Sequence, residues 1–72
     1  MTSFHHYRGY AVHAFAHPLR DNTFSADLLL ERSGESPTDA QYRFFSLDYF
    51  SKEADAVDFS RQWAREWIDA RG

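Results

Sequence analysis

The chain has 72 residues, enough for one small domain that spans residues 1–72. It contains no cysteine, which excludes disulfide bonds and thiolate zinc sites. Eight basic and eleven acidic side chains give a formal net charge of −3, the opposite of the balance that nucleic-acid-binding proteins usually carry.

The first predicted element is a β-strand over about residues 6–17. Side chains in this stretch alternate between two faces, which is typical of a strand with one buried side. One face carries Tyr10, Val12, Ala14 and Ala16, and the other carries His13, Phe15 and His17.

A short helix over residues 10–17 is the alternative. It would bring His13 and His17 to one helical face at a spacing by which two imidazoles hold zinc. Gly9 offers no N-cap hydroxyl, however, and Pro18 interrupts helical hydrogen bonding, so only about eight uncapped residues remain. In a strand the two rings lie roughly 13 Å apart and cannot share one ion. We favour the strand, and we expect no metal site and no cofactor.

Two more strands are predicted, over residues 23–32 and 41–48, each preceded by a polar loop, at residues 17–23 and 32–39. The earlier strand alternates between apolar and polar residues except at Leu29, whereas the later strand carries apolar side chains at both parities. The sequence therefore leaves open which side of the later strand faces the core, and we place Tyr42 and Phe44 on the outer side. In the earlier strand the predicted inner residues are Phe24, Ala26, Leu28 and Leu30, and the outer residues are Ser25, Asp27, Leu29 and Glu31.

The last predicted element is an amphipathic helix over residues 52–70, with Ser51 as its N-cap. Its apolar face includes Trp63 and Trp67, which we expect to cover the inner side of the strands. Small residues on the strands should leave room for the two indoles. These small residues are Ala14, Ala16 and Ala26.

Together these elements predict an α+β fold of the type β-β-β-α, in which three antiparallel strands are covered on one face by one helix. The other face stays open and mixes aromatic with polar groups. Apolar patches of this kind often mark contact sites, so we expect a homodimer or the binding of another protein there, with a plain monomer as the alternative. The predicted interaction surface comprises His13, Phe15, His17, Leu29, Tyr42 and Phe44.

Two short motifs resemble a group of small bacterial proteins of about this length whose function is unknown. One is Tyr7-Arg8-Gly9-Tyr10, which opens the first strand, and the other is Ser51-Lys52-Glu53-Ala54 followed by Arg65-Glu66-Trp67-Ile68-Asp69 in the helix. The resemblance implies strands followed by a C-terminal helix and carries over no activity. The strand order is also similar to that of some sheet-plus-helix DNA-binding and double-stranded RNA-binding domains, a similarity of fold that does not imply function.

Nucleic-acid binding is the alternative function, with sheet aromatics stacking on bases and arginines meeting phosphates. The candidate arginines are Arg8, Arg20, Arg32 and Arg43, but Asp27 and Glu31 on the same face would repel phosphate. We do not expect an enzyme, since only His13 near Asp27 suggests an acid–base pair and no catalytic motif is present. The longest aliphatic run is residues 28–30 and no signal-peptide pattern is found, so we expect a cytoplasmic protein without membrane association.

Overall fold

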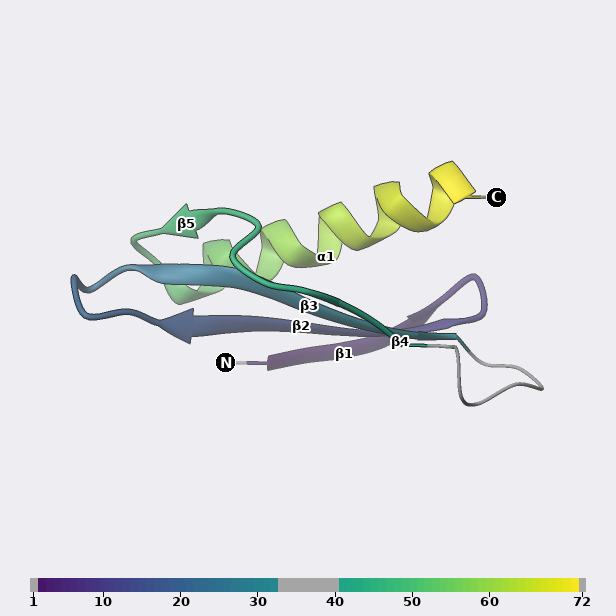
Figure 1. Ribbon diagram of the computed structural model, residues 1–72, viewed down its shortest axis with the longest axis horizontal. Helices are drawn as coiled ribbons and strands as arrows, with labels where there is room; N and C mark the ends of the chain where they lie inside the picture. The colour runs from purple at the N-terminus through teal and green to yellow at the C-terminus, as the bar shows by residue number, and fades with distance from the viewer. Residues whose placement is uncertain (1, 33–40, 72) are drawn as a thin grey trace.

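A computed structural model describes residues 2–32 and 41–71 of the chain. The strands pair antiparallel in the order β1-β2-β3-β4, and a short fifth strand pairs with the start of β3. One C-terminal helix lies on one side of this sheet (Figure 1), which confirms the predicted α+β fold, although the sheet has more strands than the three expected. The elements are β1 (Thr2–Tyr7), β2 (Tyr10–Pro18), β3 (Phe24–Arg32), β4 (Gln41–Phe44), β5 (Tyr49–Phe50) and α1 (Glu53–Arg71).

The predicted first strand is in fact a hairpin. Arg8 and Gly9 form a two-residue turn with φ angles of 49° and 84°, so both residues lie in the left-handed region. Such turns match the twist of the two strands that they join, and glycine takes this conformation without steric cost. The prediction of one strand over 6–17 was therefore wrong, because the chain reverses between Tyr7 and Tyr10 and pairs residues 2–7 with 10–15.

The predicted strand over 23–32 matches β3, but the strand predicted over 41–48 is broken. It bends at Ser46, which has a φ of 54° and whose N–H donates to the Asp27 carboxylate over 3.0 Å. After this bend the Leu47 N–H and the Asp48 carbonyl bond the backbone of Ala26, and β5 follows. Of the two predicted loops, the first is a turn closed by the Leu19 N–H on the Thr23 carbonyl. Most of the second, residues 33–39, lies outside the described residues.

The core between sheet and helix has two parts. Around the end of α1 nearest the C-terminus, Trp63 and Trp67 pack on larger residues of β2 and β3, namely Tyr10, Val12, Leu28 and Leu30. Around its first turns, Ala56 and Val57 pack on the alanines of the sheet, namely Ala14, Ala16 and Ala26. The prediction that these alanines make room for the indoles was therefore wrong. Figure 1 shows that α1 lies closer to the sheet at its start than towards its C-terminal end. The alanines pack under the close end, and the indoles pack towards the other end.

Tyr42 and Phe44 lie on the helix side of the sheet, which corrects their predicted place on the outer side. The Tyr42 ring lies 5.0 Å from the Trp67 ring, and the Phe44 ring lies 4.7 Å from the Trp63 ring, measured between centroids. In the β3–β4 register these two residues face Leu30 and Leu28, which are buried under α1. Facing residues of an antiparallel pair share a side of the sheet, so their side is set by this register.

The helix begins one residue later than predicted. The N–H of Ala56 donates to the carbonyl of Lys52, so Lys52 holds the N-cap position that we had assigned to Ser51. The buried centre of the helical face also differs slightly from the prediction, since Ala70 is exposed and the two tryptophans lie half-buried at the margin. The buried helical residues are Ala56, Val57, Ser60, Ala64 and Ile68.

Candidate functional site

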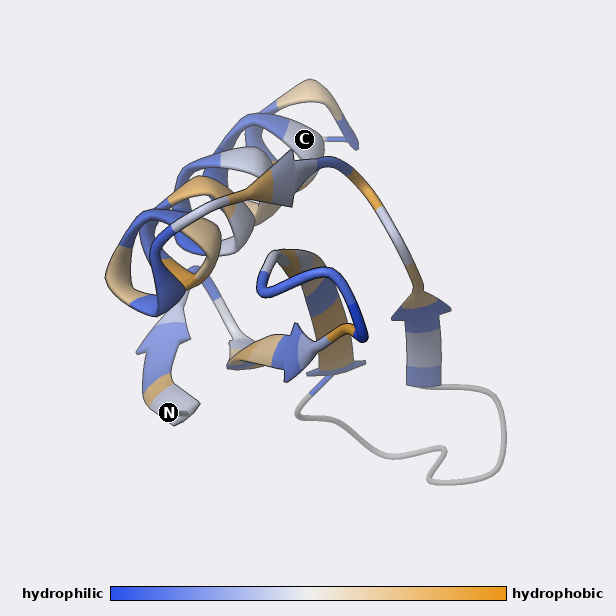
Figure 2. Ribbon diagram, turned by 90° about the vertical axis from the view of Figure 1, so that its left-hand side faces the viewer, coloured by the Kyte–Doolittle hydropathy of each residue, from blue (hydrophilic) through white to orange (hydrophobic). Residues whose placement is uncertain are grey.

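The side of the sheet that faces away from α1 is the first candidate surface, and we call it the open face. No other element in the described ranges covers it, as Figure 2 shows when the sheet is viewed nearly along its strands. In the strand register, Phe4, His13, Leu29 and Arg43 lie side by side across four strands of this face.

Within residues 2–32 and 41–71 no helix is long and apolar enough to cross a membrane.

An aromatic row crosses β1 and β2 on the open face. The Phe4 ring lies 4.6 Å from the His13 ring, and the His13 and Phe15 rings lie 6.4 Å apart with an interplanar angle of only 8°. Phe4 is 56 % exposed, although aromatic side chains of this size gain much from burial. We did not predict Phe4 as a surface residue, because β1 was not recognised as a separate strand.

Next to this row the open face has a hollow of about 370 Å³. Leu29 lines it, and Phe45 stands beside it with 71 % of its surface exposed. Phe45 follows the last residue of β4 and has the opposite parity to Phe44, so the prediction that put Phe44 on the outer side put Phe45 on the core side. The full lining is Phe15, Ala16, His17, Asp27, Leu28, Leu29, Arg43 and Phe45.

Polar groups at one end of the open face form a small network around Glu31. The Nε2 of His13 lies 2.9 Å from one Glu31 carboxylate oxygen, and the side-chain amide of Gln41 donates to the other over 3.2 Å. The hydrogen bond from Gln41, followed by that from His13, holds the pKa of Glu31 below its usual value. These bonds favour the charged carboxylate.

The predicted pairing of His13 with Asp27 was wrong. Asp27 faces Phe15 in the register, two residues away from the partner of His13. Its carboxylate accepts hydrogen bonds from the Ser25 hydroxyl and the Ser46 N–H, each over 3.0 Å. Asp27 therefore fixes the bend after β4 and does not act on His13.

The structure brings four of the six predicted surface residues to the open face, namely His13, Phe15, His17 and Leu29. The other two, Tyr42 and Phe44, lie under α1 as described above. Because residues 10–18 form a strand, His13 and His17 do not share a helical face. Among the described residues there is no group of three or more histidine, aspartate or glutamate side chains that could hold a metal ion.

The four arginines of the nucleic-acid alternative are not gathered on one surface. Arg8 lies in the turn before β2 and Arg20 in the turn after it, at opposite ends of that strand. Arg32 lies 6.0 Å from the ring centroid of Tyr10 on the helix side, whereas Arg43 lies on the open face. This scatter does not provide the continuous cationic track that a phosphate backbone requires.

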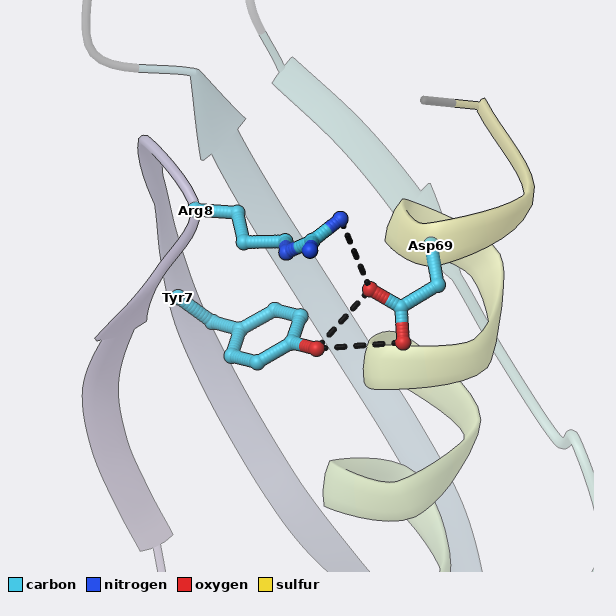
Figure 3. Close-up of polar contacts among 3 residues, drawn as sticks. All are labelled: Tyr7, Arg8 and Asp69. Carbon is cyan, nitrogen blue, oxygen red and sulfur yellow. Dashed lines mark hydrogen bonds and ion pairs between the residues drawn. The ribbon is translucent and has the colours of Figure 1, made fainter.

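A groove between β1 and α1 is the second candidate surface, with a volume of about 740 Å³. At one end the hydroxyl of Tyr7 donates to both carboxylate oxygens of Asp69, at 2.8 and 3.0 Å, and Arg8 lies 3.4 Å from the same carboxylate (Figure 3). These contacts of Tyr7 and Arg8 with Asp69, which we call the clasp, connect the hairpin to the last turns of the helix. The groove is lined by His5, Tyr7, Asp58, Arg61, Gln62, Arg65, Glu66 and Asp69.

His5 projects into this groove from β1. Its Nδ1 is buried and has no hydrogen-bond partner among the described residues. Burial lowers the pKa of the imidazole below its usual value, and the positive charges of Arg61 and Arg65 lower it further. The groove was not predicted, because its wall depends on the hairpin that the sequence reading missed.

Comparisons of the chain with protein-family models, with curated proteins and with solved structures find no match. The resemblance of the two short motifs to small bacterial proteins therefore stays a prediction. Any function has to be inferred from the two surfaces themselves.

Proposed function

We propose that the protein is a self-association module in which the open face of one copy packs on the open face of a second copy. The observation that carries the proposal is the pair of exposed phenylalanines, Phe4 and Phe45, on a sheet side that no described element covers. Exposed apolar groups that lie close together on a small protein often mark contact sites.

The open face has the self-complementarity that a two-fold dimer requires, since the same surface must serve both partners. It carries projecting rings and, next to them, a hollow that a ring from the second copy can enter. It also carries both signs of charge, with Asp27 and Glu31 beside Arg43 and two histidines. Packing the face on itself can therefore bring opposite charges together.

The size of the face limits the affinity. Nine-residue strands span roughly 30 Å and four neighbouring strands roughly 15–20 Å, so the face offers on the order of 500 Å² per copy. A standard stable interface buries about 800 Å² per partner. We therefore expect a weak dimer, with a dissociation constant of about 10–500 μM.

Size-exclusion chromatography with light scattering, from about 10 μM to about 1 mM protein, tests the proposal across this range. The mass should rise towards that of a dimer, and Phe45→Ser should abolish the rise. Gln62→Ser is the control, since Gln62 is exposed on α1, on the other side of the sheet. A monomeric mass for the unmodified protein at the highest concentration would rule the proposal out, as would equal loss in both variants.

A further inference from the structure

Among the strands of residues 2–32 and 41–71, β1 is an open edge of the sheet, because it pairs with β2 on one side and ends the strand order on the other. The two-residue turn closes on Tyr7 and Tyr10, which form a hydrogen-bonded pair in hairpins of this type. Hydrogen-bonded and non-bonded pairs alternate along an antiparallel ladder. The N–H and C=O groups of Thr2, Phe4 and His6 should therefore point away from β2, where they can pair with another strand.

The groove between β1 and α1 lies alongside this edge. A strand added to β1 would direct every second side chain to the helix side of the sheet and hence into the groove, because side chains alternate along a strand. Extended peptides bind other proteins in this way, with main-chain hydrogen bonds giving affinity and pockets for alternate side chains giving specificity. The volume of about 740 Å³ leaves space for such side chains.

The groove carries both signs of charge, and Arg65 is the position in it that favours an acidic side chain. Asp69 is already occupied by Tyr7 and Arg8, and Asp58 lies 3.8 Å from Arg61. The guanidinium of Arg65, in contrast, lies 5.6 Å from the centroid of the Tyr7 ring and has no carboxylate partner in the described part of the chain.

Burial lowers the pKa of His5 most, and the positive charges of Arg61 and Arg65 lower it further, so both guanidinium groups act on this ring. The buried Nδ1 also lacks a partner within residues 2–32 and 41–71. A carboxylate in the groove would meet the cation of Arg65, with the half-buried ring of His5 beside it.

We propose that β1 binds an extended acidic peptide segment, which joins the sheet as a further strand and places a carboxylate side chain in the groove against Arg65 and His5. A second copy of this chain is the alternative occupant of the same edge, and it would bring both carboxylates and arginines to the groove. The site is separate from the open face.

The test is a titration of ¹⁵N-labelled protein, followed by amide chemical shifts, with a nine-residue peptide that alternates threonine and glutamate. By about 1 mM peptide, shifts should concentrate on residues 2–7 and on the α1 residues that line the groove. Arg65→Gln should weaken binding about two- to fivefold, as expected for loss of an exposed ion pair. Arg20→Gln removes the same charge from the turn between β2 and β3 and should leave the affinity unchanged.

Two altered peptides separate the parts of the proposal. Glutamine in place of glutamate should weaken binding to the same extent as Arg65→Gln, and methylation of alternate backbone nitrogens should abolish binding, since it removes strand hydrogen bonds. Phe45→Ser should leave peptide binding intact while it removes self-association, so failure of one proposal does not imply failure of the other.

The proposal is overturned if no β1 amide shifts by about 1 mM peptide, if the glutamine peptide binds equally well, or if Arg65→Gln has no more effect than Arg20→Gln. It is also overturned if the β1 amides shift when the Phe45→Ser variant, which lacks association through the open face, is concentrated without peptide. That result would identify a second copy as the occupant of the edge.

Discussion

The two faces of β3 can be distinguished by truncating neighbouring leucines. Leu30 is fully buried between the sheet and α1, in contact with the cluster that includes Val12 and Ile68, whereas Leu29 is half-buried on the open face. Replacing each leucine by alanine makes the same chemical change at consecutive positions of one strand. Differences in strand propensity therefore largely cancel between the two variants.

The expected effects differ several-fold. Leu30→Ala should leave a cavity in the core and cost about 3 kcal/mol, within the usual range for buried leucines. Leu29→Ala removes a side chain that water already reaches, so it should cost about 1 kcal/mol or less. A domain of this length has a total stability of about 4–10 kcal/mol, so the larger loss leaves Leu30→Ala close to unfolding.

Urea denaturation followed by the fluorescence of Trp63 and Trp67 measures both losses. With a slope of about 1 kcal/mol per M urea, the midpoint should fall by about 3 M for Leu30→Ala and by about 1 M or less for Leu29→Ala. Working at about 5 μM protein keeps the proposed weak dimer dissociated. Equal losses in the two variants, or a larger loss for Leu29→Ala, would refute the assignment of the sheet faces.

Three further outcomes are expected. Tyr7→Phe should lower the free energy of unfolding by about 0.5–1 kcal/mol, since it removes the exposed hydrogen bonds to Asp69; no change in the urea midpoint would show that the clasp is not stabilising. Ser60→Ala should raise the free energy of unfolding by about 0.5–1 kcal/mol, because the Ser60 hydroxyl is buried without a partner among the described residues and alanine favours helix. A lower urea midpoint for this variant would show that the hydroxyl makes a stabilising hydrogen bond. The His5 ring, followed by NMR, should titrate below the usual histidine pKa, and Arg65→Gln should raise that pKa, whereas a pKa at or above the usual value would contradict the burial described. The His5 ring binds a proton more tightly in the unfolded chain than in the folded one. The free energy of unfolding therefore falls as the pH drops below the unfolded pKa of about 6.5, and it levels off below the folded pKa, where both states are protonated.

The parts of the fold that could be predicted are those where burial is one-sided. In β3 every second residue is apolar, because one side faces α1, and the helix shows its apolar face at the helical period for the same reason. The face of β2 that packs under α1 was recognised in the same way, and with it the place of His13, Phe15 and Leu29 on the open face.

The parts that could not be predicted depend on contacts between distant residues. The turn at Arg8 and Gly9 carries a single glycine as its signal and interrupts no apolar run, so it was read as part of one strand. The side on which Phe44 lies is set by pairing with β3, and the bend after it depends on a hydrogen bond from Ser46 to Asp27. As a result, Phe4 and Phe45 were missed on the open face, and the groove beside β1 was missed entirely.

The most direct test of the open face as a self-association surface is an isotope-filtered NOE experiment on an equal mixture of ¹³C-labelled and unlabelled protein at about 1 mM. We expect intermolecular contacts from the Leu29 methyl groups and from the rings of Phe15 and Phe45, and none from Trp63 or Trp67. Contacts confined to His5 and Tyr7 on the helix side of β1 or to α1, or no intermolecular contacts at all, would contradict the proposal.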